Sequence, residues 1–404
     1  MSFKQLLNEN KNTHMEHIED LIFNEGVDGT RKAINFLRDI RDMLAGSSGR
    51  KLSMTVKWDG APAVFAGVDP RDGKFFVAKK GIFNKEPKVY KTQAEVRADT
   101  SGDLADKLSI ALKLLPALGI KGVIQGDFMF GPGDVKTEDI DGKSYLTFHP
   151  NTIMYAVETG TPLAKQIKQA QIGIVWHTVY TGDSFETMQA SFGKDITKNL
   201  RQTSKVWMDD ATYKDYSGTA TLTARETAQL TKQLSNIGKL FNKVKSPVLN
   251  TIGKDPQFLI RMKAFNNASI RARGINFNNV NKDLEKYFED FMQKEIDKVK
   301  TPAAKQKKEQ TIGKWLKFLQ KNRQQIRIIY QLMGMLTEAK LTVIEKLNRT
   351  SRINTFLRTA YGFKVTNQEG FVAIDRLKGG AVKIVDRMEF SKANFSPDII
   401  KGWQ

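Results

Sequence analysis

Residues 55–65 read TVKWDGAPAVF, a short β-prone stretch interrupted by Lys57 and then by Asp59-Gly60. The β-branched and aromatic residues on both sides predict strands, and the Asp-Gly pair predicts a turn between them. A lysine at the end of a half-buried strand is costly unless its amine has a partner or a chemical task. Burial and neighbouring cations favour the neutral amine, which is a nucleophile. From these residues alone, Lys57 is either a reactive lysine or an ordinary strand end.

Strand patterns fill the chain from Ser53 to Thr181, where apolar or alternating runs are separated by Gly, Asp and Pro. The clearest are KFFVAKKGIF (74–83), GVIQGDFMF (122–130) and IGIVWHTVY (172–180). Further along, EGFVAIDRLKGGAVKIVDR (369–387) predicts two strands joined by a turn at Gly379-Gly380. The first 50 residues contain a helical pattern, TRKAINFLRDIRDMLAG (30–46).

Helical spacing replaces the strand patterns from about Leu222 to Thr359. In LEKYFEDFMQKEIDKV (284–299) apolar residues recur on one helix face. Pro302, a favoured first residue of a helix, opens a basic amphipathic stretch that we expect to run as one helix to Leu336. The chain is therefore expected to be α+β, with a strand-rich domain interrupted by a large all-α basic insertion. The expected parts are a helical segment packing on that domain (1–50), its first part (51–200), the insertion (201–362) and its last part (363–404).

The positive charge is concentrated in the helical stretch. The chain carries 64 Lys and Arg against 44 Asp and Glu, a net charge of +20. Residues 221–360 hold 28 of these basic residues and 11 of the acidic ones, which leaves an excess of +17 in this third of the chain. So concentrated an excess favours a phosphate-rich partner over a merely solvated basic face. We expect a nucleic acid that is contacted mainly through its backbone.

Composition excludes several classes of protein. The chain has no cysteine, which excludes disulfides, thiolate zinc sites and cysteine nucleophiles and suits a reducing cytoplasm. No stretch is long and apolar enough for a membrane span, and the N-terminus lacks the apolar segment of a signal peptide. We therefore expect a monomeric cytoplasmic protein (in the host cytoplasm if it is viral) with no membrane partner.

Six short motifs, taken in order, resemble those of the covalent nucleotidyltransferases, the superfamily of ATP-dependent DNA ligases, RNA ligases and mRNA-capping guanylyltransferases. KWDG (57–60) is similar to the motif whose lysine accepts the nucleotide. The other five motifs are AKKG (78–81), VIQGDFMF (123–130), IGIVWHTVY (172–180), EGFV (369–372) and AVKIV (381–385). The resemblance covers roughly residues 50–185 and 365–390. It implies a ligase-type adenylation domain of antiparallel sheets with helices.

The resemblance implies a role for each matched residue. Lys57 would attack the α-phosphate of ATP, Lys383 would neutralise that phosphate and favour the neutral amine, and Glu369 would hold Mg²⁺, which Mn²⁺ could replace. Asp127 would contact the ribose or share the metal, and Trp176 would stack on adenine. The expected catalytic residues are Lys57, Lys383 and Glu369. The expected nucleotide-binding residues are Val56, Lys57, Asp59, Gly60, Lys80, Asp127, Trp176 and Lys383.

Departures from the family pattern narrow the expectation. Asp127 stands where the family usually has Glu, and Ala61-Pro62-Ala63 lacks the arginine that DNA ligases place after the first glycine. About 20 residues follow AVKIV, too few for the OB-fold domain of DNA ligases and capping enzymes. An NAD-dependent ligase is disfavoured because its cysteine zinc module is missing. The chain therefore looks closest to phage-type polynucleotide ligases without an OB domain.

Two other readings of the sequence stay open. GPGDVKT (131–137) resembles a phosphate-binding P-loop superficially, but Val135 stands where that motif needs glycine before its lysine. The chain could also be an inactive nucleotidyltransferase-fold protein that binds nucleic acid, or act on a small molecule. If it is a ligase, we expect a nicked or splinted duplex of DNA, RNA or both. The expected phosphate contacts are Lys80, Lys314, Lys317, Lys321, Arg323 and Arg327.

Overall fold

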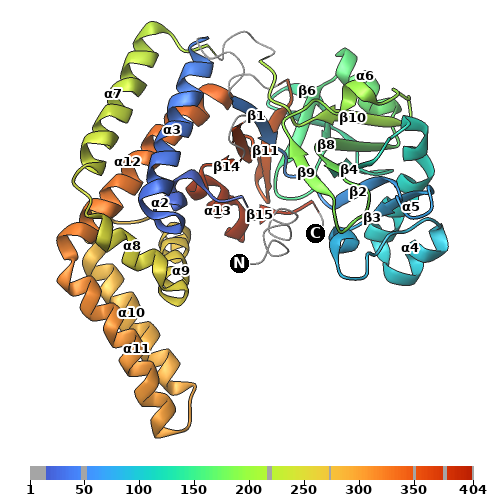
Figure 1. Cartoon of the computed structure of the whole chain (residues 1–404). Coiled ribbons are helices and arrows are strands. Elements are labelled where there is room, and N and C mark those ends of the chain that lie inside the picture. Colours follow the sequence, from blue (N-terminus) through green and yellow to red (C-terminus); the bar gives the residue numbers. More distant parts are fainter. Residues whose placement is uncertain are drawn as a thin grey trace.

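The computed structural model describes residues 15–46, 52–215, 221–272, 274–348, 352–375 and 380–402. The chain is mixed α+β, as expected, with most of its β-structure antiparallel. Figure 1 shows long helices gathered on one side of the molecule and the strands β2, β3, β4 and β8 on the other, with β1, β11 and β14 between them.

A three-stranded antiparallel sheet carries three of the matched motifs. Its strands are β1 (Leu52–Lys57), β13 (Gly370–Asp375) and β14 (Ala381–Ile384). Thr55 pairs with Val372, which pairs in turn with Lys383, and Lys57 lies opposite Gly370. Because side chains alternate along a strand, Lys57 and Lys383 emerge on the same face of this sheet. The predicted strand pair is thus present, although Gly379 of its predicted turn lies outside the described residues.

The second sheet follows the KWDG turn. Its strand order is β10-β8-β4-β2-β3, with β9 added beside β8, and β10 alone runs parallel to its neighbour. Helix α5 (Gly102–Leu114), the turn η3 (Leu115–Leu118) and α4 (Gln93–Asp99) cover one face. The strands are β2 (Ala63–Val68), β3 (Phe75–Ala78), β4 (Val123–Phe130), β8 (Ile172–Thr181), β9 (Gln189–Phe192) and β10 (Val206–Asp210). The short turns η2 (Lys80–Phe83) and η4 (Thr197–Asn199) lie on its connections.

A third sheet has the order β12-β11-β7-β6-β5, with β15 paired to β11. Helix α6 (Pro162–Gln169) packs on β7, and α13 (Arg387–Phe395) contributes Ala393 to a small core with Leu357 of β11. The strands are β5 (Lys136–Ile140), β6 (Lys143–Phe148), β7 (Met154–Glu158), β11 (Asn354–Thr359), β12 (Gly362–Val365) and β15 (Ile399–Ile400).

The N-terminal helices and the helices between residues 224 and 348 share one hydrophobic core. Helix α3 packs against α7, α8 and α12 and also against β1 and β13. The face of the three-stranded sheet opposite Lys57 contributes Met54, Phe371 and Ile384 to this core. The helices are α2 (Leu21–Asn24), α3 (Gly26–Leu44), α7 (Ala224–Phe241), α8 (Ser246–Lys254), α9 (Pro256–Ala272), α10 (Val280–Asp297), α11 (Pro302–Lys321) and α12 (Arg323–Asn348), preceded by the turn η1 (Ile18–Asp20). Within the described residues, none of the helices combines the length and apolarity that crossing a bilayer requires.

The prediction of a single helix from Pro302 to Leu336 is wrong, because the helix is interrupted at Asn322. The backbone of Asn322 leaves the helical region, and its side-chain amide donates a hydrogen bond to the carbonyl of Phe318 at 2.8 Å. Such local bonding by asparagine competes with a continuous helix. The proline start is confirmed, with Thr301 accepting a capping hydrogen bond. Helix α11 pairs with α10 in a hairpin that projects away from the rest of the molecule (Figure 1).

Candidate active site

Lys57 and Glu369 meet at the end of β1, although 312 residues separate them in sequence. The amine of Lys57 forms an ion pair with the carboxylate of Glu369, which directly precedes β13. One-third of the Lys57 side chain is exposed, whereas only 5% of the Glu369 side chain is. The buried carboxylate therefore faces an amine that solvent and substrates can still reach.

The charges of this group act on one another. Burial raises the pKa of Glu369 to about 7, and the nearby Asp59 and Asp127 add to the rise while Lys57 opposes it. Burial also lowers the pKa of Lys383, and repulsion from Lys57 lowers it further. The structure thus brings Lys57, Glu369 and Lys383 together, as the motif order predicts.

The carboxylate of Asp59 is hydrogen-bonded within the protein. Its carboxylate accepts hydrogen bonds from the backbone N–H groups of Thr152 and Ile153, both at 2.8 Å, and from the Asn151 side chain at 2.9 Å. Its own N–H donates to the Tyr155 hydroxyl at 2.7 Å. The prediction that Asp59 binds nucleotide does not agree with this buried, fully bonded carboxylate.

Gly60 allows the turn after Lys57 to pack closely on β4. A β-carbon at position 60 would lie 2.6 Å from the β-carbon of Asp127 and 2.7 Å from the carbonyl oxygen of Phe128. A side chain there would push the turn off the strand, because contacts this short are repulsive. Gly60 therefore sets the distance between Lys57 and Asp127, while a direct role in binding a nucleotide stays a prediction.

The structure corrects the prediction for Trp176. Its side chain is fully buried in the core beneath α5, where it packs over Gly126 of the neighbouring strand. A ring with no exposed face cannot stack on adenine. The next residue, His177, points the other way and lies 3.6 Å from the Asp127 carboxylate, with about a quarter of each side chain exposed. Strand alternation around a buried Trp176 would have identified His177.

Two further predicted residues lie apart from the charged cluster. Val56 turns its side chain toward the helical core, and its N–H donates to the Ala211 carbonyl, which ties β1 to the end of β10. Lys80 is exposed at the start of η2, and the described residues give it no ion-pair partner. The sequence did not single out Phe390 of α13, whose ring centroid lies 5.9 Å from the Lys57 amine.

A groove of about 1050 Å³ lies over the face of the three-stranded sheet that carries the two lysines, at the end of the sheet away from Lys57, and none of Lys57, Glu369 and Lys383 lines it. Ile374 and Ala381 line it, and the pairing register puts both on the same face as Lys57 and Lys383. Strand β9 and residues 193–198 line the opposite side.

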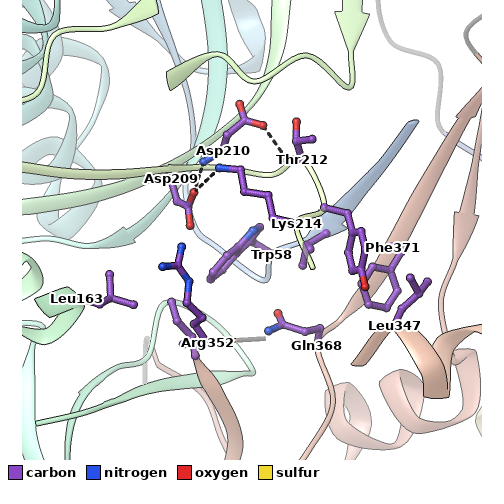
Figure 2. Close-up of a pocket in the computed structure, with 13 residues that line it drawn as sticks. Trp58, Leu163, Asp209, Asp210, Thr212, Lys214, Leu347, Arg352, Gln368 and Phe371 are labelled. Atoms are coloured by element: carbon purple, nitrogen blue, oxygen red, sulfur yellow. Dashed lines mark hydrogen bonds and ion pairs between the residues drawn. The ribbon is translucent and has the colours of Figure 1, made fainter. Parts of the chain in front are cut away.

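A second cavity lies on the other face of the sheet, beside Val56 and Phe371 (Figure 2). Trp58, Arg352 and Gln368 surround it, and Lys214 reaches Asp209 at its edge, 3.5 Å away. With a volume of about 60 Å³ it can hold a few water molecules and is too small for a nucleotide.

Residues 131–137 do not form a P-loop. The chain enters β5 at Lys136, and the Asp134 carboxylate accepts a hydrogen bond from the Gly131 N–H at 2.7 Å. A P-loop holds phosphate at the start of a helix, and here a strand follows instead. The P-loop alternative is therefore excluded.

The carboxylates of Glu369 and Asp127 could bind a magnesium ion only if oxygen atoms of the substrate complete its coordination shell. In the part of the chain that the structure describes, no group of three or more His, Asp or Glu residues could hold a metal by itself. Mg²⁺ is commonly bound by one or two carboxylates together with substrate phosphates. Glu369 and Asp127, which interact electrostatically, are residues of this kind.

The predicted basic row on α11 is exposed. Lys314, Lys317 and Lys321 lie on one side of the helix, and within the described residues none has an ion-pair partner. Arg327 on α12 is exposed as well. Arg323 differs, because it forms a two-point ion pair with Glu285, with distances of 2.7 and 2.6 Å. Its predicted role in phosphate binding is therefore weakened.

The protein is α+β, with Lys57 and Lys383 on two strands of one sheet and the buried Glu369 directly before the strand between them. The chain belongs to a family of unknown function (DUF6267), whose profile matches residues 12–398. No curated protein and no solved structure matches the chain.

Proposed function

We propose that this protein is an ATP-dependent polynucleotide ligase that forms a covalent adenylate on Lys57. The observation that carries the proposal is the convergence of Lys57, Glu369 and Lys383 on adjacent strands, with Lys57 and Glu369 in direct contact. The resemblance to nucleotidyltransferase motifs requires this convergence. The closeness of these charged residues supports the resemblance.

The chemistry of the first step follows from the residues. The neutral amine of Lys57 attacks the α-phosphorus of ATP, an N–P bond forms, the bond to the bridging oxygen breaks and pyrophosphate leaves. The contact with Glu369 orients the amine, and the proton that the amine loses on attack passes to water. Lys383 stabilises the negative charge that develops on the α-phosphate.

ATP would lie over the face of the sheet that carries Lys57 and Lys383, and Mg²⁺ would be held by Glu369 and Asp127 with the phosphates. The ion would supply positive charge that neutralises the phosphates. In the two later steps, an oxygen of a 5′-phosphate takes AMP from Lys57, and a 3′-hydroxyl then displaces AMP to join the strands.

The exposed row on α11 supports a nucleic-acid substrate. Unpaired lysines on one helix face can follow a phosphate backbone without reading bases. The row stands on a hairpin that projects from the body, so a duplex could lie beside it without disturbing the cores (Figure 1). DNA, RNA and hybrid strands would all meet this requirement.

The proposal is tested with ATP that carries ³²P at its α-phosphate and with a panel of nicked substrates. Purified protein should become labelled, and the label should pass to a 5′-phosphate at a nick before the strands are joined. A protein that takes up label but passes it to no nucleic acid would be a nucleotidyltransferase of another kind. A protein that takes up no label would exclude ligation through a lysyl adenylate.

A further inference from the structure

Residues 394–402, called the brace below, pack against the loop that holds Asp59. The amine of Lys401 donates hydrogen bonds to the Thr152 hydroxyl at 3.0 Å and to the Asn394 carbonyl at 3.1 Å. The Thr152 hydroxyl donates to the side-chain oxygen of Asn394 at 2.7 Å. The N–H of Gly402 donates to the Asn151 carbonyl at 2.7 Å. The brace thus bonds to the loop through both side chains and backbone.

The same loop fixes Asp59 from its other side. The N–H of Thr152 donates to Asp59, while its hydroxyl bonds to the brace. Asp59 lies two residues after Lys57 and is 5% exposed, so its three accepted hydrogen bonds determine where the turn sits. Contacts therefore run from Gly402 through Asn151, and from Lys401 through Thr152, to Asp59, which lies two residues after Lys57.

Position 402 tolerates no side chain. A β-carbon there would lie 1.7 Å from the carbonyl oxygen of His149 and 2.6 Å from its carbonyl carbon. Both atoms belong to the backbone and cannot rotate away, so a larger residue has to lift the brace from the loop. The His149 ring supports this arrangement through a contact of 3.2 Å between its Nε2 and the Thr152 carbonyl.

We propose that the brace positions Lys57 for attack, with Lys401 and Gly402 as the positioning residues. This inference rests on the proposed adenylation of Lys57, because attack on phosphorus demands alignment with the leaving group. Neither residue has to touch ATP. Their effect is on the turn that carries the nucleophile.

The test compares Lys401→Met and Gly402→Ala with two matched controls in the full-length protein. Lys401→Met keeps the length of the side chain but removes its donors. The controls are Lys364→Met, at an exposed lysine in β12, and Gly238→Ala, at a helical glycine with no neighbouring atom within 4 Å of an added β-carbon. Self-adenylation is measured over a range of ATP concentrations, together with hydrogen exchange in peptides covering residues 55–62 and 149–155.

Both brace variants should slow adenylation at saturating ATP by roughly tenfold or more. The ATP concentration for half-saturation should stay within about twofold of wild type, because neither variant changes a residue proposed to contact ATP. Amides in both peptides should exchange faster than in the controls. Lys401→Met is the milder change, and its adenylation rate and hydrogen exchange test the inference if Gly402→Ala does not fold.

Wild-type rates and wild-type exchange in Lys401→Met would overturn the inference. A uniform rise in exchange over the whole chain would also overturn it, because that pattern indicates general destabilisation. If the wild-type protein forms no adenylate, the proposed function fails and the exchange data alone decide. Faster exchange confined to the two peptides would then still establish the brace as the support of the Lys57 turn.

Discussion

At the scale of single residues, the site combines the partly exposed amine of Lys57 with the Glu369 carboxylate, whose pKa is raised by burial. The attraction of Lys57 offsets only part of the free-energy penalty that burial places on the ionised Glu369 carboxylate. Such an arrangement lowers stability, and proteins keep it where the groups have a chemical task. The same reasoning predicts how stability and activity separate when the carboxylate is removed.

Glu369→Gln should abolish adenylation and stabilise the fold at alkaline pH. The raised pKa of Glu369 makes wild type lose stability as pH rises from about 4.5 to about 7, by roughly 3 kcal/mol. The neutral amide is free of this loss, and Lys57 is exposed enough to stay solvated. Thermal unfolding of both proteins at pH 5 and pH 8 measures the difference. Equal pH slopes for the two proteins would contradict the burial of an ionisable Glu369.

Sequence patterns predicted the charged residues of the site better than its apolar and supporting ones. Lys57, Glu369 and Lys383 belong to motifs that keep their order along the chain. The face on which Trp176 lies depends on the core beneath α5, which no local pattern describes. The partners of Asp59 come from residues 151–153, whose position is set by the packing of β7 and the brace. Such contacts between distant segments leave no local signal.

At the scale of elements, the strands that carry matched motifs formed where alternation and Gly punctuation predicted them, for example β4 at Val123–Phe130. Strand patterns have period two and are short, so few alternatives fit them. The helix break was missed because apolar spacing continues across Asn322 from Leu319 to Ile326. Both of those side chains are buried, so the predicted core stripe is confirmed although the helix is not continuous.

Replacing Lys317 and Lys321 by Ala should weaken duplex binding for all base sequences and leave self-adenylation unchanged. Each phosphate contact contributes roughly −0.9 to the slope of log affinity against log salt on B-form DNA, so the variant should show a flatter slope. Fluorescence anisotropy across a salt series measures it. The double change Lys165→Ala and Lys168→Ala on α6 is the matched control, since both lysines are exposed. Wild-type affinity and slope in the α11 variant would show that this row is only a solvated face.

At the scale of the whole molecule, a buried ion pair ties the first described residues to the last long helix. Glu19 and Lys340 are both about 99% buried, and their side chains meet at 2.8 Å. Burial opposes ionisation of Glu19, but the combined interactions with Lys340, His17 and Arg387 outweigh it and lower the pKa to about 2. Arg387 of α13 contacts Asp20 beside this pair at 2.9 Å. The helical side and the three-stranded sheet also share one hydrophobic core, so we expect them to unfold together.

Lys340→Met should destabilise the protein by about 3–5 kcal/mol, because it leaves Glu19 buried without its main partner. The double change Glu19→Gln with Lys340→Met should recover most of this loss. Chemical denaturation of the three proteins measures it, and each should unfold in one transition because the core is shared. Separate transitions for the helical side and the three-stranded sheet would contradict this shared core.

The central claim is tested most directly by the mass of the intact protein after incubation with ATP and Mg²⁺. The account predicts a gain equal to one AMP, located on the peptide that contains Lys57. Lys57→Ala should show no gain, and neither should Lys57→Arg, because a guanidinium stays protonated and cannot attack phosphorus. An AMP adduct that persists in Lys57→Ala, or its absence from the wild-type protein, would contradict the account.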